Sequence, residues 1–84
     1  MAISHSVQDY LKTIYKLQNG HGASEPVNTT LLSETMGVAA ASVTSMFKKL
    51  AEMNLVSHAP YKGVALTDVG EKAALEVVRH HRLL

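Results

Sequence analysis

The stretch from Ala39 to Leu50, AAASVTSMFKKL, combines small side chains, hydroxyl groups and two lysines. A helix advances ~100° per residue, so a helix here separates a bulky apolar stripe from a face of small residues. Alanine and serine allow close approach to base edges, and lysine pairs with phosphates. The pattern therefore favours double-stranded DNA as the partner. The residues that we expect to face DNA are Ala39, Ala41, Ser42, Thr44, Ser45, Lys48 and Lys49.

This face also has a simpler interpretation, and the sequence leaves it open. A face of small residues is often a solvated or packing surface, and lysines near a helix C-terminus are favoured by the helix dipole. No arginine lies on the face, so we do not expect bidentate recognition of guanine from it. Sequence specificity would then depend on DNA shape, methyl contacts and the spacing of half-sites in a dimer.

Helical patterns precede this stretch and predict how it is held. Apolar residues with i, i+3, i+4 and i+7 spacing predict a first helix that starts at Ser4 or Ser6. A short helix follows, capped near Thr29 and ended by Gly37, a residue that tolerates positive φ. Helix, short turn and helix together predict a helix-turn-helix.

A β-hairpin is expected after the helix-turn-helix. Leu55–His58 and Val64–Leu66 have the composition of short strands, and the loop between them contains Pro and Gly. A hairpin in this place forms the wing of a winged helix-turn-helix, and Tyr61 and Lys62 at its tip would contact the DNA backbone. The predicted fold class is therefore mainly α: a three-helix bundle with a two-stranded β wing, followed by a further helix.

Composition narrows the class of protein. The chain has 84 residues, 46% of them hydrophobic, a net charge of +1 and no cysteine, which indicates one small domain without disulfides or a cysteine zinc site. No apolar run reaches membrane-spanning length and no signal peptide is recognisable, so we expect a cytoplasmic protein without a membrane partner. We also expect no enzyme, because paired carboxylates, a nucleophile with a base, and a phosphate-binding glycine loop are lacking.

Much of the chain resembles the metal-dependent repressors of the DtxR/MntR type. The segments that carry the resemblance are DYLKTIYKL (9–17), ASVTSMFKKLAEMNLV (41–56), YKGVALTDVGEKAA (61–74) and RHHRLL (79–84). The resemblance implies a homodimeric transcriptional regulator, a repressor that binds operator DNA when loaded with Mn²⁺ or Fe²⁺. It implies a DNA-binding domain over residues 1–66. Residues 67–84 would be a linking helix at which the dimerisation and metal-binding region begins and the chain stops.

The resemblance assigns Asp9 and His81 as metal ligands. Lys12 stands where one manganese-type subgroup has a carboxylate, which argues against a two-metal site. From the residues alone, Asp9 is a first-turn acid near Lys12, and His81 is either a core histidine or a ligand. Carboxylate and imidazole suit Mn²⁺ or Fe²⁺. Two ligands do not make a site, so we expect metal control in the full-length protein and weak or absent binding by this chain.

A second function also fits the sequence. Winged helices also serve as protein–protein interaction modules without metal control, and the near-neutral charge permits this here. The last helix, apolar along one face, would then be the interface.

Overall fold

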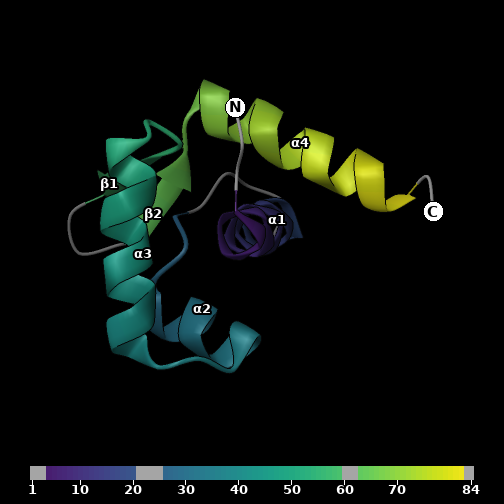
Figure 1. Cartoon of the computed structure of the whole chain (residues 1–84). Helices are drawn as coiled ribbons and strands as arrows, with labels where there is room; N and C mark the ends of the chain where they lie inside the picture. The colour runs from purple at the N-terminus through teal and green to yellow at the C-terminus, as the bar shows by residue number, and fades with distance from the viewer. Residues whose placement is uncertain (1–3, 21–25, 60–62, 83–84) are drawn as a thin grey trace.

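The computed structural model describes residues 4–20, 26–59 and 63–82, with the backbone alone for residues 20, 59 and 80–82. In this part of the chain, the elements are α1 (His5–Gly20), α2 (Thr29–Met36), α3 (Ala40–Glu52), β1 (Val56–Ala59), β2 (Gly63–Leu66) and α4 (Asp68–Arg82). They form the mainly helical winged helix-turn-helix that the sequence predicts (Figure 1). None of the described helices is long and apolar enough to cross a membrane.

Helix α1 begins directly after Ser4, whose hydroxyl oxygen accepts a hydrogen bond from the Val7 N–H at 3.3 Å. Of the two predicted starts, Ser4 rather than Ser6 is therefore the cap. Asp9 consequently lies in the second turn, and its assignment as a first-turn acid is wrong. In the described part of the chain, no ion pair joins Asp9 to Lys12.

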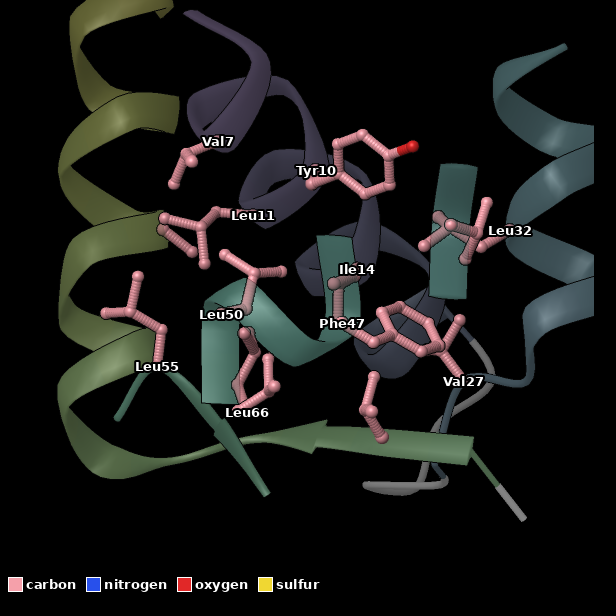
Figure 2. Close-up of a cluster of buried hydrophobic side chains, with 14 residues drawn as sticks. Val7, Tyr10, Leu11, Ile14, Val27, Leu32, Phe47, Leu50, Leu55 and Leu66 are labelled. Atoms are coloured by element: carbon pink, nitrogen blue, oxygen red, sulfur yellow. The ribbon is translucent and has the colours of Figure 1, made fainter. Parts of the chain in front are cut away.

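The hydrophobic core forms around α1, which packs against α4 and also contacts α2 and β2 (Figure 1). Figure 2 shows side chains from the helices and from the hairpin converging on this helix. The buried residues are Val7, Tyr10, Leu11, Ile14, Val27, Leu32, Val43, Phe47, Leu50, Leu55, Val56, Val64, Leu66 and Ala74. Burial of a large aliphatic or aromatic side chain contributes about 1.5–3 kcal/mol. The apolar stripe of each helix is therefore fixed inward, and the opposite face of α3 is left at the surface.

The hairpin is antiparallel, and its last pair before the tip joins Ala59 to Gly63. Both strands thus reach one residue nearer the tip than predicted. On the other side of β2, Val27 forms a bridge with Val64, through N–H···O hydrogen bonds of 2.7 and 3.0 Å. Gly63 has φ 116°, and a Cβ there would overlap the Val27 carbonyl, so glycine is needed at this position. The sequence did not predict this bridge, which anchors the wing to the segment before α2.

Helix α4 starts as predicted, with Thr67 as its cap. The Thr67 hydroxyl accepts a hydrogen bond from the Gly70 N–H at 3.0 Å and donates one to the Asn54 carbonyl at 2.7 Å. Asp68 and Glu71 lie in the first turn, where acidic side chains favour the helix dipole. This single hydroxyl therefore joins the start of α4 to the turn after α3.

Candidate nucleic-acid interface

Helix α3 has one buried and one exposed face. Val43, Phe47 and Leu50 are buried, as the 3.6-residue period predicts. The predicted DNA-facing residues all lie exposed on the surface: Ala39, Ala41, Ser42, Thr44, Ser45, Lys48 and Lys49. The fold therefore brings small side chains, hydroxyls and two ammonium groups onto one accessible edge. In Figure 1 this helix lies at the periphery of the molecule.

A shallow depression on the outer side of α3 follows from the small size of its side chains. Its lining comes from this helix alone: Ala41, Ser42, Ser45, Met46 and Lys49. Methyl, hydroxyl and ammonium groups are thus offered together. They match thymine methyl groups, base-edge acceptors and phosphate oxygens.

The three hydroxyls on this face differ in what they can donate. Thr44 Oγ1 donates to the Ala40 carbonyl at 3.1 Å, so its proton is engaged within the helix and the oxygen is left to accept. The hydroxyls of Ser42 and Ser45 make no hydrogen bond within the described residues. Ser42 and Ser45 are therefore the hydroxyls with a proton available for a base or a phosphate.

The turn before α3 sets how this helix projects. Gly37 ends α2 with φ 69° and donates its N–H to the Ser33 carbonyl at 2.9 Å, as the sequence predicts for a glycine stop. The Ser33 hydroxyl donates to the Val38 carbonyl at 2.7 Å, a contact that the sequence did not predict. Its only sequence signal is a serine one helical turn before the glycine. The two contacts hold the turn closed and fix α3 relative to α2.

The N-terminus of α3 has no side-chain cap. Ala39 occupies the cap position with φ −69° and ψ 146°, and an alanine methyl group cannot accept a hydrogen bond. The Ser42 and Val43 N–H groups turn back to the Ala39 carbonyl at 3.0 and 3.2 Å. Within the described residues, the Ala40 and Ala41 N–H groups at this end of α3 have no side-chain acceptor, a state that suits a phosphate.

Two predicted contact residues of the wing, Tyr61 and Lys62, lie outside the described residues. The strands that would present them are in place, with His58 opposite Val64 and Ala59 opposite Gly63. Ser57 and His58 lie on opposite faces of β1 and are both exposed, whereas Val64 of β2, opposite His58, is held in the core.

The candidate metal ligands are placed only in part. Asp9 is exposed on α1, and His81 lies in the last turn of α4, its side chain outside the described part. Among the residues that the structure describes, no group of three or more His, Cys, Asp or Glu side chains gathers closely enough to hold a metal ion. The carboxylate of Asp9 and the imidazole of His81 are donor types that suit Mn²⁺ or Fe²⁺. Two such ligands do not complete a metal site.

Comparison with known proteins identifies this architecture. The family model "Iron dependent repressor, N-terminal DNA binding domain" matches residues 2–64. The chain belongs to this family. The family is one of metal-dependent regulators, as the resemblance of the four segments implied.

Relatives of this repressor family support the assignment. The chain is 32% identical over 82 residues to an uncharacterised HTH-type transcriptional regulator of Methanocaldococcus jannaschii, covering 98% of this chain and 64% of the relative. It is 33% identical over 78 residues to the transcriptional regulator MntR of Escherichia coli O157:H7, covering 93% and 48%. These relatives are named as regulators and not as enzymes, in agreement with the prediction. The chain spans about half to two thirds of their length.

Solved structures give the same result for the fold. The structure of ScaR with bound Zn²⁺ superposes with a TM-score of 0.76 at 32% identity, over 92% of this chain and 34% of that one. A MarR family protein from Bacillus stearothermophilus superposes with a TM-score of 0.75 over 98% of this chain and 56% of that one. At 18% identity, the second similarity shows the winged-helix fold alone.

Proposed function

We propose that this chain is the operator-binding part of a metal-dependent transcriptional repressor, which acts in the cytoplasm as a homodimer. The observation that carries the proposal is the exposed face of α3, where small side chains lead to Lys48 and Lys49 while Val43, Phe47 and Leu50 are buried behind them. Membership of the family supports it, because the matching model describes a DNA-binding domain.

In the proposed complex, α3 lies in the major groove. Ser42 and Ser45 donate to base edges or phosphates, and the alanines contact thymine methyl groups. Lys48 and Lys49 position the helix on the backbone. In a homodimer, two copies would meet half-sites about one helical turn, ~34 Å, apart, so the operator would be palindromic. The wing would add Tyr61 and Lys62 at the neighbouring backbone.

The metal part of the proposal assigns Asp9 and His81 as ligands of Mn²⁺ or Fe²⁺. The helices that carry them, α1 and α4, pack against each other. A bound cation would link the carboxylate of Asp9 to the imidazole of His81. No group of three donor side chains that could hold a metal ion is found among the described residues. We therefore expect the dissociation constant of Mn²⁺ from this chain to be weaker than micromolar. Calorimetric titration with Mn²⁺ tests this, and sub-micromolar binding by this chain would contradict it.

Fluorescence anisotropy titrations with a labelled random-sequence duplex at low salt test the DNA-binding part. The informative variant is Ser45→Glu, which puts a carboxylate on the exposed face of α3. Its matched control is Val69→Glu, which makes the same charge change at a 48% exposed position in the first turn of α4. We expect wild type and Val69→Glu to bind alike, and Ser45→Glu to bind at least about tenfold more weakly, because it adds a charge of the same sign as the phosphates.

Two outcomes would count against the proposal. Equal weakening by Ser45→Glu and Val69→Glu would mean that net charge matters and that α3 does not lie against DNA. Failure of the wild-type chain to bind duplex at low salt would favour a protein-interaction module. Helix α4 would then be the interface to examine, since Val69 and Leu75 are 48% and 36% exposed on it.

A further inference from the structure

Helix α1 carries a buried amide that the DNA-facing surface does not use. Gln18 is 4% exposed and lies among the apolar residues that α1 turns toward the core. Its Oε1 accepts a hydrogen bond from the Leu66 N–H at 3.1 Å, across 48 residues of sequence. No buried side-chain nitrogen or oxygen in the described part of the chain lacks a partner. The buried amide is therefore satisfied at its position between α1 and β2, which the burial of a polar group requires.

The outer edge of β2 explains why this contact exists. Successive N–H groups of a strand alternate in direction, so Val64 and Leu66 point theirs to the same side, away from β1. The Val64 N–H donates to the Val27 carbonyl at 3.0 Å. Among the described residues, Val27 pairs with Val64 alone, and the Leu66 N–H two residues further on donates to Gln18. The Gln18 side chain thus does for Leu66 what a backbone carbonyl of a third strand would do.

We propose that Gln18 is the positioning residue that sets the base of the wing against α1. The inference rests on the proposed DNA-binding function, because it concerns how the wing is aimed relative to α3. Leu66 pairs with Val56 at the base of the hairpin, farthest from the tip. Four strand residues span ~13 Å. A tilt of roughly 10° at the base therefore moves the tip end by ~2 Å, enough to break a hydrogen bond to a phosphate.

The wing needs this clamp because the hairpin is short. Two strands of four residues are marginally stable by themselves, so their orientation depends on what they pack against. The Val27 bridge holds the hairpin near its middle, and Gln18 holds it at its base. Together with the buried side chains of Val56, Val64 and Leu66, these two edge contacts fix the orientation of the hairpin.

The test compares Gln18→Met with Gln18→Glu. Methionine keeps the length and volume of the side chain and removes the acceptor, whereas glutamate keeps an acceptor oxygen. Hydrogen exchange followed by NMR reports the Leu66 amide directly. In Gln18→Met we expect its protection to fall by about tenfold relative to amides in the middle of α1, and in Gln18→Glu to remain closer to wild type. Unchanged protection of Leu66 in Gln18→Met would overturn the clamp, whether or not the chain binds DNA.

The functional readout is binding of duplex DNA at a temperature where each variant is fully folded. We expect Gln18→Met to bind about threefold to tenfold more weakly, with partial recovery in Gln18→Glu. The amide shifts that DNA induces should persist in α3 and shrink in β1 and β2, which a general loss of stability would not produce. Equal affinity of Gln18→Met and wild type would refute the positioning role. A wild-type chain that does not bind duplex would refute the proposed function and this role together, while leaving the exchange result to decide the clamp itself.

Discussion

Removal of two positive charges from α3 should weaken the salt dependence of DNA binding. Lys48 and Lys49 are exposed on the outer side of α3. Each lysine that neutralises a phosphate makes the negative slope of log K against log salt steeper by about 0.9. The double variant Lys48→Ala/Lys49→Ala should therefore make this slope shallower by about 1.8 for one bound chain, or by about 3.6 for a dimer on two half-sites.

This change in slope has a measurable consequence. Between 50 and 200 mM salt, a slope difference of about 1.8 changes the affinity ratio of wild type to variant by roughly 12-fold. Anisotropy titrations at four or five salt concentrations measure both slopes. The matched control is Lys16→Ala/Lys72→Ala, which removes the same charge from exposed positions on α1 and α4.

The control decides the interpretation. We expect Lys16→Ala/Lys72→Ala to keep a slope close to that of wild type, since neither lysine lies on α3. Equal slopes for the two double variants would show that the lysines act through net charge alone. The assignment of α3 as the DNA-contacting helix would then be refuted.

Three further predictions concern stability. Asn28→Ala should cost about 1 kcal/mol in urea denaturation, because the Asn28 side chain caps α2 by accepting the Leu31 N–H at 2.7 Å; an unchanged unfolding midpoint would contradict this. Gly70→Ala should cost about 1–3 kcal/mol or more, since its Cβ would overlap the Leu55 carbonyl, and calorimetry would show a lowered Tm. Burial raises the pKa of Tyr10 above its usual 10.0. The contribution of the neutral Tyr10 side chain to the free energy of unfolding is therefore complete below pH 10 and is lost as the pH rises through the raised pKa. Tyr10→Phe should remove this part of the alkaline loss of stability, measured as unfolding free energy from pH 8 to 11.

Much of the fold was predictable from the sequence because its signals are local. The helix stop at Gly37 and the cap at Thr67 depend on residues within one turn, and both were confirmed. The division of α3 into a buried and an exposed face follows from spacing alone, so the exposure of the candidate DNA-contacting residues was also predictable. The start of α1 was less certain because two serines compete as its cap.

The tertiary structure decided what depends on residues distant in the chain. The bond between Gln18 and Leu66 spans 48 residues, and the Val27–Val64 bridge joins segments on either side of the helix-turn-helix. A glutamine at the end of an amphipathic helix and a single valine before a cap have no periodicity that marks a partner. Sequence thus determined which face of α3 is exposed, because helical spacing fixes it locally. Folding determined how the wing is held beside that face, because only the packed core brings the distant partners within hydrogen-bond distance.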